Sequence, residues 1–252
     1  MQNYFTIKNK ICNFKKTIRV SGDKSLSIRW ILFASLASGK SRAKNLLISE
    51  DVLATIQAIK KLGIKTSYQN KELTIYGKGI NGYKYKKNLV INAENSGTLG
   101  RLLLGLLIDS KYPIKLIGDK SLSRRDFKRI ADPLSKFGAK FKLNKNKYLP
   151  LTVKGTSNFN SINYTESKGS AQCKSSVIFG GLRSDKTTFI KAKKSRNHTE
   201  LLCKYLKLPL IIKEKRNYDE IKVEKVKSIK PLNYNIPSDI SSSAFFIILT
   251  VL

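Results

Sequence analysis

Residues 58–79, AIKKLGIKTSYQNKELTIYGKG, decide the fold because the chain repeats their pattern twice more. They show the end of an amphipathic helix closed by a glycine, then two β-rich runs that flank a polar turn at residues 69–71. Residues 133–155, PLSKFGAKFKLNKNKYLPLTVKG, keep the same order. Residues 204–223, KYLKLPLIIKEKRNYDEIKV, follow it with Pro209 where the others have glycine.

Each copy follows a polar loop that leads into an apolar helix. These helices are expected from Ser25 to Leu36, from Asn95 to Ile108 and from Ser170 to Leu182. One unit therefore reads polar loop, buried helix, strand, amphipathic helix and strand pair. Three such units of about 70 residues predict one α/β domain of pseudo-threefold character, with mixed sheets covered by helices.

A fourth helix start follows a predicted linker at residues 227–235. Residues 236–252, IPSDISSSAFFIILTVL, resemble residues 20–36, VSGDKSLSIRWILFASL, in order and spacing. We expect a three-repeat substrate-binding domain over residues 21–235 and the opening of a second domain at 236–252. The apolar end has no helix cap or polar tail, so we expect a chain truncated at its C-terminus.

The charge of the chain is strongly positive. It holds 49 Lys and Arg against 17 Asp and Glu, a formal net charge of +32 at pH 7. Clustered cations favour polyphosphates because they release condensed counterions, but these cations are mostly lysines scattered along the chain. We expect a solvated basic surface that attracts small phosphorylated anions, and no nucleic-acid partner.

Cysteine usage and hydropathy favour a cytoplasmic protein without a membrane partner. The three cysteines, Cys12, Cys173 and Cys203, show no metal or redox spacing, and their odd number argues against a disulfide framework. The N-terminus lacks the apolar core of a signal peptide, and no apolar run reaches the ~18 residues of a membrane span. With 41% hydrophobic residues, the chain can build a real core.

The stretch SGDKSLSIRW, residues 21–30, places two cations at a helix start. Ser25 or Ser27 is predicted to cap the helix, while Lys24 and Arg29 can reach the same pocket as its first free N–H groups. A capped helix with two solvated cations explains this stretch equally well.

Further loops repeat the combination of hydroxyl, amide and cation. They are residues 95–101 with Gly97, residues 118–130 with five cations, and residues 167–174 and 194–200. His198 fits an ordinary helix start better than a general base. The loops show no carboxylate pair or metal-ligand cluster, so we expect sites for phosphate and carboxylate groups of small molecules.

Taken in order, these loops resemble the 3-phosphoshikimate 1-carboxyvinyltransferase family, the 5-enolpyruvylshikimate-3-phosphate synthases. The resemblance covers essentially the whole chain. It implies an inside-out α/β barrel with three βαβαββ repeats per domain, in which residues 1–20 belong to the second domain. The matching motifs are SGDKSLS (21–27), NSGT (95–98), GDKSLSRR (118–125), PLTV (150–153), SAQCKS (170–175), SRNHTE (195–200) and PSDISSSAFF (237–246).

The resemblance also implies a reaction of the shikimate pathway to aromatic amino acids. The enolpyruvyl group of phosphoenolpyruvate passes to the 5-hydroxyl of shikimate 3-phosphate, and phosphate leaves. No metal and no cofactor are implied, the full-length protein is expected to be a monomer, and the acid and base residues are expected beyond Leu252.

The resemblance further implies which residues bind the two substrates. Lys174 is expected as a neighbour of the site. Shikimate 3-phosphate is expected to contact Lys24, Ser25, Arg29, Ser170, Gln172, Ser195 and Arg196. Phosphoenolpyruvate is expected to contact Lys24, Asn95, Gly97, Arg125 and Gln172.

Three positions depart from the family pattern. Glu94 and Ser238 stand where glycine is usual, and Asp126 stands where proline is usual. A carboxylate at Glu94 weakens local anion binding unless it points to solvent.

Two alternatives remain open from the sequence. A sister transferase acting on UDP-N-acetylglucosamine shares the architecture but typically uses a loop cysteine and does not match these motifs in this order. A basic nucleic-acid-binding protein is favoured by net charge alone, and its mark is steeply salt-dependent binding to DNA. Quenching of Trp30 by substrate supports the transferase.

Overall fold

The computed structural model describes residues 17–251, which form three units with the element order that the repeat predicts. The first unit holds α1 (Lys24–Leu36), β1 (Ser38–Lys44), α2 (Glu50–Lys61), β2 (Lys65–Gln69) and β3 (Glu72–Lys78). The second holds β4 (Leu89–Asn92), α3 (Gly97–Leu106), β5 (Ile114–Ile117), the 3₁₀ helix η1 (Leu122–Arg124), α4 (Lys128–Ser135), β6 (Lys140–Asn144) and β7 (Tyr148–Lys154). The third holds β8 (Ile162–Glu166), α5 (Ala171–Arg183), β9 (Thr188–Lys193), α6 (His198–Tyr205), β10 (Leu210–Glu214) and β11 (Tyr218–Val223), before β12 (Asn233–Asn235) and α7 (Ile240–Val251).

The first unit takes its missing strand from the other end of the chain. The sheets of the second and third units have the strand orders β4-β5-β7-β6 and β8-β9-β11-β10, and each begins with a parallel pair. In the first sheet, β12-β1-β3-β2, the same place is filled by β12, which pairs parallel with β1. Residues 227–235 are therefore not only a linker, because their last three residues complete the first βαβαββ unit.

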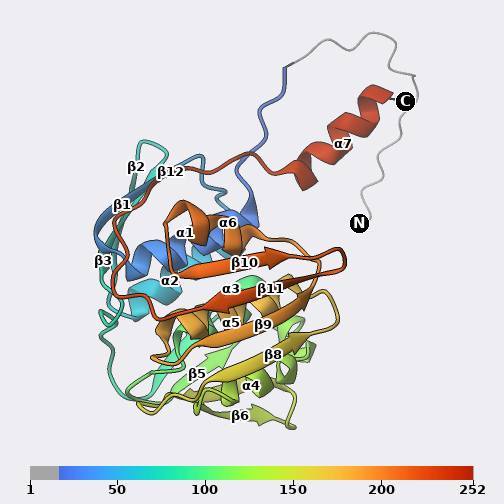
Figure 1. Ribbon diagram of the computed structural model, residues 1–252. Coiled ribbons are helices and arrows are strands. Elements are labelled where there is room, and N and C mark those ends of the chain that lie inside the picture. Colours follow the sequence, from blue (N-terminus) through green and yellow to red (C-terminus); the bar gives the residue numbers. More distant parts are fainter. Residues whose placement is uncertain (1–16, 252) are drawn as a thin grey trace.

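The three sheets lie on the outside, and the helices α1, α3 and α5 lie between them (Figure 1). These helices are buried almost all round. Most of their buried side chains are apolar, but α1 and α5 also bury polar residues such as Arg29, Lys174 and Ser175. α3 and α5 pack most closely at Gly105, where a Cβ atom would lie 2.2 Å from the backbone oxygen of Ser176. Phe33 of α1 meets Phe179 of α5 with ring centroids 4.8 Å apart. This arrangement confirms the inside-out α/β barrel.

The second helix of each unit ends in a residue with a left-handed backbone conformation. In the third unit this residue is not the one that the repeat pattern paired with the glycines. Gly63 has φ +86°, and its equivalent after α6 is Lys207, with φ 53°. The N–H of Leu208 bonds to the carbonyl of Cys203 at 2.9 Å, which closes the helix as a Schellman motif. Pairing Pro209 with the glycines was therefore wrong by two residues.

The chain enters and leaves the three-unit body side by side. Gly22 and Ser238 form an antiparallel bridge, and the N–H of Asp23 donates to the carbonyl of Pro237 at 2.8 Å. Beyond this crossing α7 extends away from the body (Figure 1). Its apolar side chains are exposed, with Phe245 at 79%. Within residues 17–251 no helix is long and apolar enough to cross a membrane.

Some of the sequence predictions fall outside the described residues. Cys12 and most of the predicted segment 1–20 lie there, whereas Cys173 and Cys203 are free and buried. Residues 17–20 lie in no helix or strand.

Gly105→Ala is expected to destabilise the fold by about 1–3 kcal/mol, because the added methyl group meets backbone that cannot move aside alone. Gly100→Ala on the same helix is the matched control. There a Cβ atom would lie 3.3 Å from the edge of the Phe127 ring, which can shift. Urea unfolding of both variants measures the difference, and an equal loss in the two would contradict the close contact of α3 with α5.

Candidate functional site

The three buried helices begin with side-chain caps. The Oδ1 atom of Asp23 accepts from the N–H of Leu26 at 2.7 Å, so Asp23 caps α1, and the expectation of a cap at Ser25 or Ser27 was wrong. The chain is extended at Asp23 and helical from the next residue, which leaves both serines inside the helix. Ser96 and Ser170 cap α3 and α5 in the same way.

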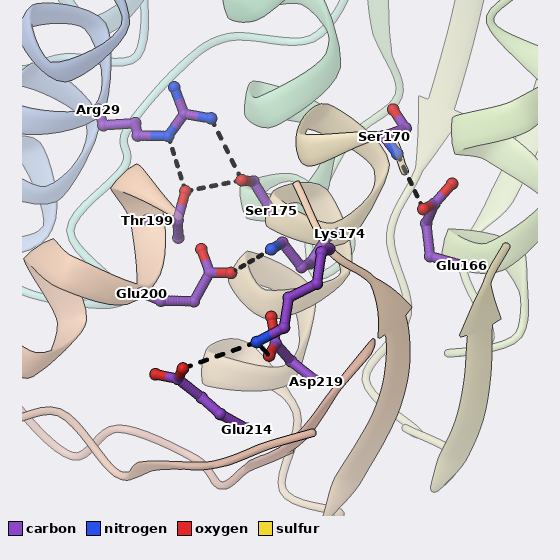
Figure 2. A network of polar contacts seen from close by, with 10 residues as sticks. Arg29, Glu166, Ser170, Lys174, Ser175, Thr199, Glu200, Glu214 and Asp219 are labelled. Atoms are coloured by element: carbon purple, nitrogen blue, oxygen red, sulfur yellow. Dashed lines mark hydrogen bonds and ion pairs between the residues drawn. The ribbon is translucent and has the colours of Figure 1, made fainter. Parts of the chain in front are cut away.

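The first turns of α3 and α5 contact each other through Gln172, one of the predicted ligands. Its Nε2 donates to the Oγ1 of Thr98 at 3.1 Å, and its Oε1 accepts from Arg101. Ser170, at the start of the same helix, is tied by its N–H to the buried carboxylate of Glu166 at 2.8 Å (Figure 2). Two loops that are distant in sequence therefore meet at one surface.

Asn95, Gly97 and Arg125, predicted for phosphoenolpyruvate, also lie together. The Oδ1 of Asn95 accepts from Arg125 at 2.9 Å, and its Nδ2 donates to Asp119 at 2.5 Å. A Cβ atom on Gly97 would lie 3.0 Å from Nη1 of Arg101 and 3.3 Å from Nη1 of Arg125. Glycine thus leaves room for two guanidinium groups beside the first N–H groups of α3, an arrangement suited to an anion.

Arg29 is buried, at 3% exposure, and hydrogen-bonds to Thr199 and Ser175 (Figure 2). Its Nη1 also donates to the carbonyl of Ser25 at 3.1 Å. Burial lowers the pKa of Arg29 to about 10, although Glu200 opposes the shift. Burial, aided by the neighbouring Arg129, likewise lowers the pKa of Arg101. Cations whose charge is penalised in this way gain most from a bound anion.

The remaining predicted ligands are less closely joined to this group. Lys24 pairs with Asp51 on α2 at 3.2 Å, and its side chain is 47% exposed. Ser195 is half-buried, and its Oγ finds no hydrogen-bond partner among residues 17–251. Arg196 is exposed in the turn before α6.

Lys174, expected as a neighbour of the site, is completely buried. Its Nζ lies 2.5 Å from Oε1 of Glu200, an ion pair between α5 and α6 (Figure 2). Its charge is therefore engaged inside the protein.

The three departures from the family pattern have local explanations. Glu94 adopts φ 49°, and its exposed carboxylate accepts from Asn92 at 2.6 Å, beside the shallow groove along α2. Asp126 accepts from the N–H of Arg129 at 3.3 Å, near the start of α4. The hydroxyl of Ser238 donates to the carbonyl of Val20 at 2.9 Å and so ties the chain crossing together.

Sequence reasoning did not single out Arg101, Glu166 and Thr199. Arg101 carried a usable signal, because it lies four residues after Gly97, the spacing that links Ser25 with Arg29. Thr199 acts through contacts with distant segments, which no local pattern shows. Glu166 contacts the nearby backbone N–H groups of Lys168 and Ser170, a local signal that was missed.

His198 is the one histidine of the sequence and begins α6. It is half-buried, and its Nδ1 finds no partner among the described residues. Burial lowers its pKa below 6.5; Asp23 and Asp239 oppose the shift, whereas Arg29 and Arg196 strengthen it.

Because the folded pKa of His198 is lowered, the unfolded chain takes up a proton first as the pH falls below about 6.5. We expect the free energy of unfolding to fall between about pH 7 and pH 5, and part of this fall to vanish in His198→Gln. Urea unfolding across this range measures both. The single imidazole signal in NMR should titrate below 6.5, and a midpoint above that value would contradict the burial effect.

The comparisons with known proteins point to one family. The sequence model of EPSP synthase (3-phosphoshikimate 1-carboxyvinyltransferase) matches residues 8–252. A 3-phosphoshikimate 1-carboxyvinyltransferase of Streptococcus agalactiae is 40% identical over 236 residues, which are 93% of this chain and 54% of that protein. One from Leuconostoc mesenteroides is 36% identical over 92% of this chain and 52% of its own length.

A solved structure agrees with these matches. The EPSP synthase from Acinetobacter baumannii superposes with a TM-score of 0.83 at 34% identity, covering 92% of this chain and 52% of that one. The chain thus spans about half the length of the curated relatives it matches. With the family model matched over residues 8–252, and with the fold and loop order in agreement, the chain belongs to the EPSP synthase family.

Proposed function

We propose that this chain supplies the shikimate 3-phosphate-binding part of an enzyme that transfers the enolpyruvyl group of phosphoenolpyruvate to the 5-hydroxyl of shikimate 3-phosphate, with release of phosphate. The observation that supports the proposal is the meeting of several predicted ligands within the first two turns of α1, α3 and α5. Gln172 contacts Thr98 of α3, and Arg29 of α1 contacts Ser175 of α5.

The charges of this surface suit the proposed substrates. Shikimate 3-phosphate and phosphoenolpyruvate are both anions and repel each other, so their encounter needs cations held in place. Arg29, Arg101 and Arg125 are each fixed by a hydrogen bond to a neighbouring side chain. Cations that are oriented before the substrates arrive lose little on binding and hold the substrates in attack geometry.

We assign shikimate 3-phosphate to Lys24, Ser25, Arg29, Ser170, Gln172, Ser195 and Arg196, and phosphoenolpyruvate to Lys24, Asn95, Gly97, Arg125 and Gln172. In this proposal Lys24 leaves Asp51 to face both substrates.

The domain boundaries belong to the same proposal. We propose that residues 21–235 form the substrate-binding domain and that residues 236–252 open a second domain; the pairing of β12 with β1 supports the end of the first. The exposed apolar side chains of α7 support this division, because such a surface is ordinarily covered. We further propose a cytoplasmic protein that acts as a monomer, with no nucleic-acid partner.

The 252-residue chain is expected to bind shikimate 3-phosphate, and the binding should quench the fluorescence of Trp30, which is buried next to Arg29. Lys24→Ala is expected to weaken binding about tenfold, the loss of ~1.4 kcal/mol that one charged contact can supply. Lys140→Ala on β6 is the control and should bind as the unchanged chain does. Absence of saturable binding, or an unchanged affinity after Lys24→Ala, would contradict the proposal.

By itself the chain is expected to show no turnover. The resemblance places the acid and base residues of the reaction outside these 252 residues. Release of phosphate from phosphoenolpyruvate in the presence of shikimate 3-phosphate measures this directly. Phosphate release by the purified chain at a rate that falls with Arg125→Ala would show that the necessary groups are already present.

A further inference from the structure

Arg29 uses one particular edge of its guanidinium group inside the protein. Its Nε donates to the Oγ1 of Thr199 at 2.7 Å, and its Nη2 donates to the Oγ of Ser175 at 3.2 Å (Figure 2). Nε and Nη2 lie on the same side of the planar group, so two hydroxyl groups fill the whole side edge.

The two hydroxyl groups are themselves joined. Thr199 donates from Oγ1 to the Oγ of Ser175 at 2.7 Å, so the three groups form a closed ring of hydrogen bonds. Both serine and threonine are buried, at 1% and 0% exposure. A buried ring of this kind has one low-energy arrangement, because breaking any bond leaves a donor or an acceptor without water.

The residues adjacent to Ser175 and Thr199 form a second polar contact between α5 and α6. Lys174 precedes Ser175 on α5, Glu200 follows Thr199 on α6, and the two form the buried ion pair at 2.5 Å. The two helices therefore meet through two adjacent polar contacts. Removing one partner of a buried ion pair is strongly destabilising, because it leaves an uncompensated buried charge.

These contacts fix the orientation of the Arg29 guanidinium group and leave some of its N–H donors unused. A guanidinium group has five N–H donors. Three are engaged, by Thr199, by Ser175 and by the carbonyl of Ser25, which accepts from Nη1 at 3.1 Å. Nη1 and Nη2 each keep one further N–H group without an acceptor among residues 17–251. Paired N–H groups of one guanidinium are the fork that binds carboxylate or phosphate oxygens.

We infer that Thr199 and Ser175 are positioning residues, which turn the end of the Arg29 guanidinium toward an oxyanion of the substrate. The inference rests on the proposed function, in which Arg29 binds shikimate 3-phosphate. Neither hydroxyl touches the substrate. Their contribution is to hold the arginine in one orientation before binding, so that less freedom is lost when the ligand arrives.

The test compares Thr199→Val, which keeps the shape and removes the hydroxyl, with Thr199→Ser, which keeps the hydroxyl. Isothermal titration of the 252-residue chain with shikimate 3-phosphate gives each affinity, and thermal unfolding shows that the variants are folded. We expect binding to weaken about five- to tenfold in Thr199→Val and less than about twofold in Thr199→Ser. Ser175→Ala should weaken binding in the same direction and serves if Thr199→Val does not fold.

A double-mutant cycle separates positioning from a general structural role. In an Arg29→Lys background, Thr199→Val should change the affinity by less than about twofold, because lysine has no fork to orient. An equal loss in both backgrounds, or no loss in either, would overturn the inference.

The nitrogen-15 NMR signal of the Arg29 Nε–H gives a reading without ligand. It is identified by its absence in Arg29→Lys, and it should shift and exchange faster with water in Thr199→Val but not in Thr199→Ser. An unchanged signal overturns the inference. If the unchanged chain fails to bind shikimate 3-phosphate, the proposed function fails, and this signal still decides whether Thr199 orients the arginine.

Discussion

The helices α1, α3 and α5 are enclosed by three sheets, and the first backbone N–H groups of each helix need hydrogen-bond acceptors. The rest of the structure depends on how these groups are paired. α1, α3 and α5 are buried along their lengths. The first turns of α3 and α5 meet through Gln172, and Arg29 joins α1 to α5 one turn further on. Asp23, Ser96 and Ser170 each satisfy one N–H per helix start. The N–H groups left over carry partial positive charge, and this makes the surface where they meet attractive to anions.

Arginine is the residue that adapts this surface to its ligands. Arg29, Arg101 and Arg125 all lie near a helix start, and hydroxyl and amide side chains orient them. The buried cations are costly alone, which is why their pKa values fall with burial for Arg29 and Arg101. The fold thus buries positively charged guanidinium groups at a cost in free energy, and a bound anionic substrate would offset that cost.

The sequence predicted the repeating unit well, because helix ends, hairpin turns and apolar runs are local patterns. The sequence predicted contacts between distant parts of the chain less well. β12 completes the first sheet from 191 residues away, as the pairing of Ala43 with Tyr234 shows, and no local pattern reports such a partner. The sequence pattern paired Pro209 with the glycines that close the other two helices, whereas Lys207 takes the left-handed conformation at the end of α6.

In the candidate site, too, local features were predicted better than contacts between distant residues. Capping by Asp23 rather than by a serine depended on where the helix begins, a boundary that sequence patterns give only to within a few residues. The predicted ligands in the loops were found by their order, and the assignment of each to a substrate stays a prediction. Thr199 escaped notice because its partner Arg29 lies 170 residues earlier in the chain, on another helix.

Amide chemical-shift mapping of the chain during titration with shikimate 3-phosphate tests the central claim most directly. If the first turns of α1, α3 and α5 form one site, their amide signals, with those of the loop before α6, should shift together and give a single dissociation constant. Shifts confined to one helix start, or scattered over the surface lysines with a steep dependence on salt, would contradict the account.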